Sequence, residues 1–438
     1  MADEVRRLDL LEATDWARLP GIEAFALSNG VRVVAEAMPA VRSVAIGLWV
    51  LAGSRHEPEA LQGVSHFVEH LMFKGTERRS AREIAEAMDA VGGQLNAFTS
   101  KEYTCFHARV LDEHLPLAVD VIADMLLASL LRAEDIERER GVIQEEIGHY
   151  EDTPDELVHD LFAQAMWPNH PLGRSVLGTR ASIAQLGRED ILRYLRSAYA
   201  AANTVIAVAG NFNPGELREL LERQFGSWRG GGSSREDAVP QSGRSTALRS
   251  KDAELLHVCL GGEGLPVGHK DIYALSVLSN ILGGGPSSRL FQEIREERGL
   301  AYSVFAYTAS YRDSGAFVIY CGAGPERIQA ALRVLGGELR KICRSGVDAR
   351  ELSRAKEQFK SNITMALESS GARMNRIGRA VLLSGKAISI DQVLERIDRI
   401  ELADISRLAS QFCDPERLTL AAIGPDPDRH DLRGAITG

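Results

Sequence analysis

His66-Phe-Val-Glu69-His70 is the stretch of this 438-residue chain that decides most about its fold and chemistry. Two histidines stand four residues apart, and an acidic residue stands between them. Because an α-helix turns by about 100° per residue, the two imidazoles lie about 40° apart on one helix face. Two ring nitrogens at this spacing can bind one zinc ion, and Glu69 is close enough to accept a proton from an attacking water.

The residues around this motif are apolar on almost every side of the expected helix, which predicts that the helix is buried. These residues are Val64, Phe67, Val68, Leu71, Met72 and Phe73. Burying two histidines and a glutamate is costly unless they share a partner, and a metal ion is such a partner. The alternative is a pair of buried histidines that hydrogen-bond to backbone groups.

A catalytic zinc site needs a third protein ligand and one open position. Residues 134–150 predict a second helix, because apolar side chains recur there at helical spacing: Ile136, Ile143, Ile147 and Tyr150. Glu139 and Glu146 fall inside this apolar stripe, seven residues apart. We expect Glu146 to be the third ligand and Glu139 to be an auxiliary acid that orients a ligand. The alternative is that arginines pair with both glutamates.

These residues resemble a known family. His66-x-x-Glu69-His70, followed by Glu146, is similar to the inverted zincins of the pitrilysin type, and above all to mitochondrial processing peptidase β subunits and their bacterial homologues. Further segments match along the chain, roughly from residue 22 to residue 425: Gly75-Thr76, Gly92–Ser100, His170–Gly173, Leu177–Thr179, Gly283–Gly285, Ser288–Leu290 and Arg298–Tyr302. The glycine loop at 283–285 is short, as in the catalytic type of subunit.

The resemblance implies a role for each matching residue. It assigns His66, His70 and Glu146 as ligands of one Zn²⁺ per chain. It assigns catalytic roles to Glu69 as general base and to Glu139 as an additional glutamate. It places the substrate along Asn96, Ala97, Phe98 and Thr99. It also brings a substrate-binding and catalytic pair, Arg295 and Tyr302, to the catalytic site from the far half of the enzyme.

Composition narrows the class of protein. The chain has 51 basic and 61 acidic residues, a net charge of −10, which disfavours nucleic acid as a partner. It contains no run of ~18 apolar residues that would span a membrane, and its first residues form no signal peptide. Five scattered cysteines are typical of reduced thiols. We therefore expect a cytoplasmic, bacterial protein with no membrane partner.

The predicted third ligand belongs to an acidic cluster: Glu145, Glu146, Glu151, Asp152, Asp155 and Glu156. If it faces a substrate chamber, it would attract basic peptides. A solvated helix end is the alternative.

The chain divides into two halves. A Gly- and Ser-rich stretch predicts a linker at 229–246, between an N-terminal domain at 1–228 with the zinc site and a C-terminal domain at 247–438 without one. Asp190-Ile191 and Gly210 recur 214 residues later as Asp404-Ile405 and Gly424, which indicates a distant repeat. Strands alternate with helices in each half, so we expect two similar α+β halves built on mixed sheets.

Full-length members of the family have four such modules, whereas this chain has two. The resemblance therefore implies half of a clamshell, completed by a second chain around a chamber, either in a homodimer or with an inactive paralogue. The expected function is a zinc-dependent endopeptidase that cleaves peptides or small unfolded polypeptides. A non-catalytic structural or assembly subunit of the same fold is the alternative. An unrelated zinc hydrolase is disfavoured by the matches beyond residue 280.

Overall fold

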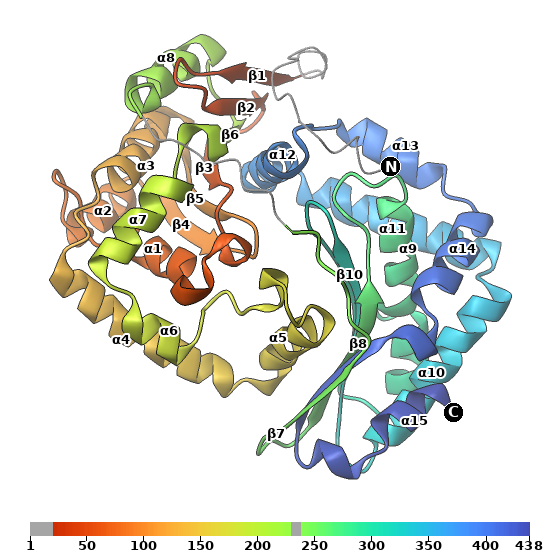
Figure 1. Ribbon diagram of the computed structural model, residues 1–438. Helices are drawn as coiled ribbons and strands as arrows, with labels where there is room; N and C mark the ends of the chain where they lie inside the picture. Colours follow the sequence, from red (N-terminus) through yellow and green to blue (C-terminus); the bar gives the residue numbers. More distant parts are fainter. Residues whose placement is uncertain (1–20, 229–237) are drawn as a thin grey trace. The chain divides into compact units, whose positions relative to one another are not determined.

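The computed structural model describes residues 21–228 and 238–438, which form two compact α+β units (Figure 1). The first unit takes in residues 21–147, 175–228 and 365–389, and the second takes in residues 148–174, 238–364 and 390–438. Each unit contains one mixed β-sheet. The predicted fold class, two mixed-sheet α+β halves, is confirmed.

The first unit is built on a six-stranded sheet in the order β1-β2-β6-β3-β5-β4. Only β2 and β6 run parallel; the other neighbours are antiparallel. The strands are β1 (Ile22–Ala26), β2 (Arg32–Ala37), β3 (Ser43–Val50), β4 (Gln94–Thr99), β5 (Thr104–Leu111) and β6 (Thr204–Gly210). Among the described residues β4 pairs with β5 alone, which leaves its other edge open to another strand.

Helices cover both faces of this sheet. They are α1 (Val64–Met72), α2 (Ala81–Asp89), α3 (Leu115–Ala128), α4 (Ala133–Glu151), α6 (Arg180–Gln185), α7 (Arg188–Ala198), α8 (Pro214–Phe225) and α12 (Ser370–Ser384). Strand β3 shows why two layers form, since alternate side chains point to opposite faces. Ile46 and Leu48 pack into the main core with α1 and α3, whereas Trp49 packs with Met374 and Ile377 of α12.

The second unit is built on a five-stranded sheet in the order β7-β11-β8-β10-β9, in which only β7 and β11 are parallel. Its strands are β7 (Thr246–Ser250), β8 (Leu256–Glu263), β9 (Ser303–Ser310), β10 (Gly315–Ala323) and β11 (Thr419–Gly424). Its helices are α5 (Pro154–Met166), α9 (Ile272–Gly283), α10 (Ile328–Ser345), α11 (Ala349–Ala366), α13 (Ile390–Asp398), α14 (Leu402–Phe412) and α15 (Leu432–Thr437).

The internal repeat appears in the topology. Strands β6 and β11 occupy equivalent places, each parallel to one neighbour and antiparallel to the other. Both end on the glycine that the sequence offset marks, and Gly210 and Gly424 have φ values of 137° and 150°. A Cβ at either position would lie 2.3 Å from Ser43 O or 2.6 Å from Leu255 O, so only glycine fits these strand ends.

Each sheet is covered on one face by a helix from the opposite half of the sequence. Helix α12, which follows the linker, packs on β2, β3 and β6 of the first unit. Helix α5, which precedes the linker, packs on β8 and β11 of the second unit through Leu157, Val158 and Phe162. The division at 1–228 and 247–438 therefore does not coincide with the compact units. Of the expected linker, residues 229–237 lie outside the described residues, and Thr246 already belongs to β7.

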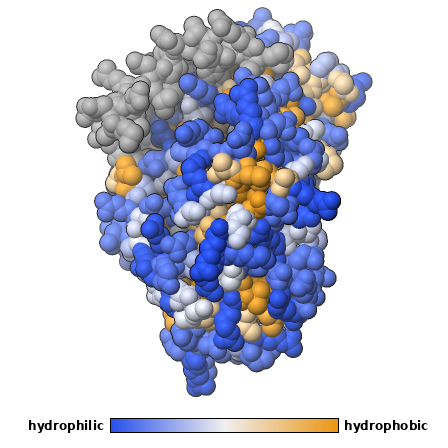
Figure 2. Space-filling view, turned by 90° about the vertical axis from the view of Figure 1, so that its right-hand side faces the viewer, coloured by the Kyte–Doolittle hydropathy of each residue, from blue (hydrophilic) through white to orange (hydrophobic). Residues whose placement is uncertain are grey.

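In the part of the chain that the structure describes, no helix combines the length and the apolar character that a membrane crossing requires. The face drawn in Figure 2 is mainly polar, and its apolar side chains gather in separate patches. All five cysteines are free, and four of them are buried.

Candidate metal centre

Helix α1, which carries the histidine motif, is held at its first turn. The carboxylate of Glu57 accepts hydrogen bonds from the N–H of Gly63 at 2.7 Å and of Ser65 at 2.8 Å. A negative charge at a helix N-terminus satisfies orphan donors and complements the helix dipole. The Ser65 hydroxyl also lies 2.7 Å from the Tyr194 hydroxyl of α7. Sequence reasoning missed Glu57, although its charge shortly before a predicted helix was a usable signal.

Helix α4, which carries both glutamates, is fixed beside α1 by Arg140. The guanidinium donates to the carbonyl groups of Ile183 and Leu186, the latter at 2.7 Å. It also lies over the Phe67 ring of α1, 5.7 Å from the ring centroid. Helix α4 runs from Ala133 to Glu151, close to the predicted range of 134–150.

The structure brings His66, His70 and Glu146 together. His66 Nε2 lies 3.7 Å from Glu146 Oε1, and His70 Nε2 lies 3.6 Å from Glu146 Oε2. These distances exceed those of good hydrogen bonds. They fit a shared ion, because two ligand atoms each ~2.1 Å from zinc are at most ~4.2 Å apart. Within residues 21–228 and 238–438, no other cluster of three such donors could hold a metal.

The donor set suits zinc, with two imidazoles and one carboxylate leaving a position open. Burial, and then the nearby His70, lower the pKa of His66 to about 4. At neutral pH the His66 ring is therefore uncharged, the form in which it can donate a lone pair to a metal. Its Nδ1 is buried and has no hydrogen-bond partner among the described residues.

Glu139 lies behind His70. Its Oε2 is 3.2 Å from His70 Nδ1, and its Oε1 is 2.8 Å from the ammonium of Lys74. The residue is only 3% exposed. This is the placement expected of an acid that orients a ligand. The alternative in which arginines pair with both glutamates is wrong for Glu139, whose cationic partner is Lys74, and no arginine pairs with Glu146 among the described residues.

Glu69 extends from α1 toward strand β4. The Thr99 hydroxyl donates to Glu69 Oε2 at 2.6 Å. Burial raises the pKa of Glu69, and the bond from Thr99 acts in the opposite direction. A carboxylate with a raised pKa beside three metal-type donors has the character of a general base. The structure therefore gives Thr99 a contact with Glu69 that the sequence did not suggest.

The predicted substrate segment forms the edge strand β4. Along it, Ala97 is buried and Asn96 is exposed. The Asn96 side chain accepts a hydrogen bond from the N–H of Ala97 at 2.8 Å. Phe98 instead packs edge-on against Trp49, with ring centroids 5.7 Å apart. Their roles in substrate binding stay predictions.

Arg295 and Tyr302 belong to the second unit. Arg295 lies in a π-helical stretch, Phe291–Glu296, and its guanidinium carbon is 6.0 Å from the centroid of the Tyr302 ring. Tyr302 is 75% exposed, which is unusual for a large aromatic side chain. The two residues are thus a contacting pair, and their approach to the metal centre stays a prediction.

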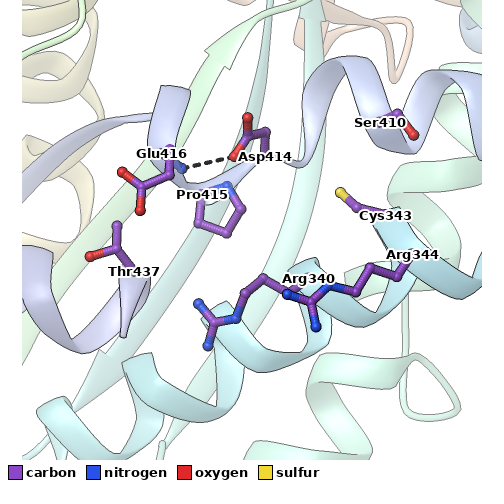
Figure 3. A pocket seen from close by; sticks show the side chains of 8 residues that line it. All are labelled: Arg340, Cys343, Arg344, Ser410, Asp414, Pro415, Glu416 and Thr437. Carbon is purple, nitrogen blue, oxygen red and sulfur yellow. Dashed lines mark hydrogen bonds between the residues drawn. The ribbon is translucent and has the colours of Figure 1, made fainter.

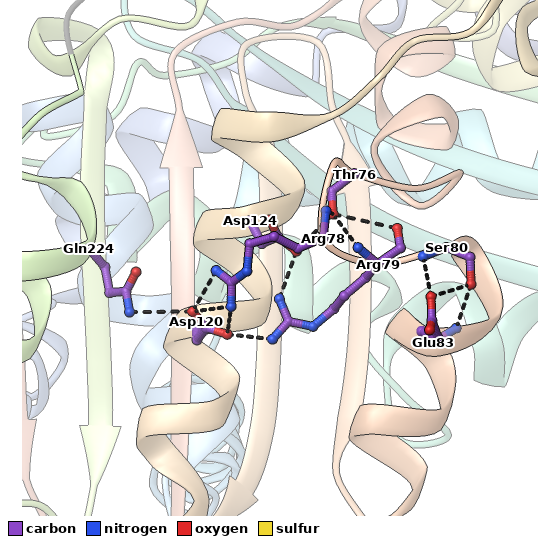
Figure 4. A network of polar contacts seen from close by, with 8 residues as sticks. All are labelled: Thr76, Arg78, Arg79, Ser80, Glu83, Asp120, Asp124 and Gln224. Atoms are coloured by element: carbon purple, nitrogen blue, oxygen red, sulfur yellow. Dashed lines mark hydrogen bonds and ion pairs between the residues drawn. The ribbon is translucent and has the colours of Figure 1, made fainter.

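A network of ion pairs holds the loop that follows α1 (Figure 4). Asp124 of α3 accepts from the Thr76 hydroxyl at 2.8 Å and from Arg79 at 2.7 Å. Asp120, one turn earlier, pairs with Arg78 at 2.8 Å. The loop that leaves the metal helix is therefore anchored to the core.

The second unit has a pocket of about 310 Å³ between α10 and the segment after α14 (Figure 3). Two arginines, Arg340 and Arg344, face two acidic residues, Asp414 and Glu416. Because these charges balance, the lining favours neither anions nor cations. Burial raises the pKa of the Cys343 thiol in this wall, which makes the thiol a poor nucleophile.

Helix α9 of the second unit, unlike α1 of the first, contains no histidine and so offers no imidazole ligand for a metal.

Known protein families and proteins match most of the chain. Residues 32–180 match the model "Insulinase (Peptidase family M16)", and residues 185–359 match "Peptidase M16 inactive domain". The Bacillus subtilis protein YmxG, named an uncharacterized zinc protease, is 44% identical over 92% of this chain and 98% of its own. A Streptomyces coelicolor protein with the same description is 42% identical over 93% of this chain and 90% of its own.

Solved structures share the fold. A Helicobacter pylori protease superposes with a TM-score of 0.87 at 24% identity, covering 93% of this chain and 100% of that one. A chain of complex III2 from Candida albicans superposes with a TM-score of 0.81 at 22% identity, covering 95% of this chain and 100% of that one. Family models match residues 32–180 and 185–359, and relatives match over nine-tenths of the length, so this chain belongs to the insulinase family of peptidases, peptidase family M16.

Proposed function

We propose that this chain, a zinc protease of family M16, is an endopeptidase that cleaves peptides or small unfolded polypeptides, with Glu69 as its general base. The observation that carries the proposal is the convergence of His66, His70 and Glu146, whose ligand atoms all lie within 4.8 Å of one another. Glu69 extends from the same helix turn. We propose one Zn²⁺ per chain, which is supported by the one such cluster in the described part of the chain.

The bound metal would supply Lewis-acid chemistry, lowering the pKa of a water toward ~7 and polarising the peptide carbonyl. Glu69 takes the proton of the attacking water and passes it to the leaving amine. The Thr99 hydroxyl, 2.6 Å from Glu69 Oε2, holds the carboxylate in one orientation during both transfers. Glu139 holds the His70 ring through Nδ1.

The substrate lies extended along the free edge of β4, bound mainly through its backbone. A peptide that pairs there displaces the Asn96 side chain from the Ala97 N–H, which then donates to the peptide. Backbone pairing tolerates many sequences, so selectivity comes from chamber size, from charge and from contacts with residues such as Phe98. The acidic cluster that includes Glu146 favours basic peptides.

The Tyr302 hydroxyl donates a hydrogen bond to the developing oxyanion, and Arg295 holds the tyrosine ring. The pair acts from the second unit of the same chain or from a partner chain. A homodimer closing around a chamber is the simplest assembly, and a heterodimer with an inactive paralogue is the other arrangement. The alternative function, a structural or assembly subunit, is disfavoured because that role needs neither a converged donor set nor a general base.

The test compares Glu69→Gln with Glu134→Gln, a matched change on an exposed residue of α4 that lies outside the acidic cluster. Hydrolysis of a fluorogenic peptide should fall by about 10²- to 10⁴-fold in Glu69→Gln, because general-base catalysis is lost. Its zinc content should equal that of the wild type, and Glu134→Gln should be unchanged in both. Normal turnover by Glu69→Gln would refute the proposed mechanism.

Chelation separates the two functions. Activity should disappear when a chelator removes the metal and return when zinc is restored. A wild-type chain that contains no zinc and cleaves no peptide would favour the structural subunit instead. Basic and acidic versions of the same peptide, assayed in parallel, test the expected preference for basic substrates.

A further inference from the structure

Lys74 contacts the metal centre through one intervening residue. It follows α1 by two positions, and its ammonium lies 2.8 Å from Glu139 Oε1. The other oxygen of that carboxylate lies 3.2 Å from Nδ1 of His70. Lys74, Glu139 and His70 thus form a continuous row of contacts. The Lys74 side chain is 33% exposed, whereas that of Glu139 is 3% exposed, so the row begins at the protein surface and leads to the ring of a predicted ligand.

Glu139 depends on this lysine for charge balance. A buried carboxylate without a partner is strongly unfavourable, and breaking a buried pair costs more than the pair itself contributes. Lys74 is the one lysine or arginine that pairs with Glu139 among the described residues. Since the two Glu139 oxygens serve different partners, the position of the lysine also sets the rotation of the carboxylate toward His70.

Lys74 is itself held in place. Its backbone N–H donates to the carbonyl of Leu71 at 3.1 Å, so it continues directly from the last turn of α1. Two residues later, the Thr76 hydroxyl binds Asp124 of α3 at 2.8 Å (Figure 4). The lysine therefore projects from a segment that is fixed at both ends, and its contact with Glu139 does not depend on a mobile loop.

The two histidines differ in their outer contacts. Nδ1 of His66 has no hydrogen-bond partner among the described residues, whereas Nδ1 of His70 faces Glu139. When a histidine binds a metal through one nitrogen, a carboxylate that accepts from the other fixes the tautomer and the ring orientation. Only His70 has this support here, so the precision of the centre depends on the Lys74–Glu139 pair.

We propose that Lys74 is a positioning residue for the zinc ligand His70. It turns the Glu139 carboxylate so that Oε2 accepts the proton of His70 Nδ1, which leaves Nε2 free for the metal. This inference rests on the proposed zinc site. It predicts that loss of the ammonium weakens zinc binding, although among the described residues the Lys74 ammonium pairs with Glu139 and not with a metal ligand.

The experiment measures the zinc dissociation constant of the full chain by competition with a chromogenic chelator, separately from peptide hydrolysis. Lys74→Met should raise the constant by about 10- to 100-fold, the usual effect of losing an outer contact of a metal ligand. Lys74→Arg, which keeps a cation, should restore it to within about threefold. Lys386→Met, the same change at an exposed lysine of the first unit, is the control and should bind zinc like the wild type.

A second comparison separates positioning from general structure. In a Glu139→Gln background, Lys74→Met should cause no further loss of zinc affinity, because the two residues act in series. Lys74→Gln, which keeps a shorter donor, replaces Lys74→Met if the latter does not fold, and should bind zinc with intermediate affinity. A dissociation constant within twofold of the wild type in Lys74→Met, or a full extra loss in the Glu139→Gln background, would overturn the inference. Zinc binding without hydrolysis in the wild type would instead overturn the proposed function alone, and an absence of zinc binding would overturn both.

Discussion

Glu57 holds the N-terminus of the metal helix, and replacing it with glutamine should loosen that helix. Its two carboxylate oxygens accept from Gly63 at 2.7 Å and from Ser65 at 2.8 Å, and the residue is 4% exposed. Glutamine keeps one acceptor oxygen, so one buried N–H loses its partner, which costs about 1–3 kcal/mol. Removing the charge from the helix N-terminus adds about 0.3–1 kcal/mol.

A loss of ~2.5 kcal/mol makes the locally unfolded form of α1 about 70-fold more populated, because ~1.36 kcal/mol is a factor of ten in an equilibrium constant. Amide hydrogen exchange of the segment 64–72, measured in the zinc-free protein so that the metal does not mask the effect, should accelerate by that factor. Glu59→Gln is the control: Glu59 is exposed two residues away, and its replacement should shift local stability by less than ~0.5 kcal/mol. Equal exchange in the two variants would refute the assignment of Glu57 as the cap.

Two further predictions concern the second unit. A Cβ at Gly336 would lie 2.0 Å from the carbonyl oxygen of Ile436, so Gly336→Ala should destabilise the protein by ~1–2 kcal/mol. A Cβ at Gly337 would meet nothing within 4 Å, so Gly337→Ala should stabilise α10 by up to ~1 kcal/mol. Urea unfolding measures both changes, and equal midpoints would contradict the packing. Burial lowers the pKa values of His159 and His257, so the unfolded chain binds protons first and stability should fall as the pH drops below ~6.5. Glutamine at both positions should flatten the change in urea midpoint between pH 7.5 and 5.5, and an unchanged slope would show that other groups cause it.

Local periodicity explains how much of the metal centre could be predicted. His66 and His70 share a face of α1 because helical geometry alone sets the positions of residues four apart. The apolar stripe of α4 singled out Glu139 and Glu146 in the same way, since a carboxylate among isoleucines must have a partner. The apolar stripe does not indicate which residue that partner is, so arginines were an alternative. The structure identifies the cationic partner of Glu139 as Lys74.

The contacts that the sequence did not reveal join segments far apart in the chain. Thr99 binds Glu69 across 30 residues, and Ser65 meets Tyr194 across 129. Neither contact produces a periodic pattern in the sequence, because each depends on where an edge strand or a neighbouring helix packs in the folded protein. The repeat at an offset of 214 residues did predict equivalent strand ends, because Gly210 and Gly424 both have a positive φ there, which favours glycine, and both lie too close to a neighbouring segment for a Cβ.

By itself, the sequence determined local features: the helix that carries His66 and His70, the helix at 134–150, the two similar α+β halves, and which side chains of α1 and α4 face a core. Only the tertiary structure decided how those elements associate. Helices α5 and α12 each cover the sheet formed largely by the other half of the sequence, so the compact units cross the linker. The physical reason is that an amphipathic helix encodes an apolar face but not its partner, and the partner is whichever uncovered sheet face that helix fits best.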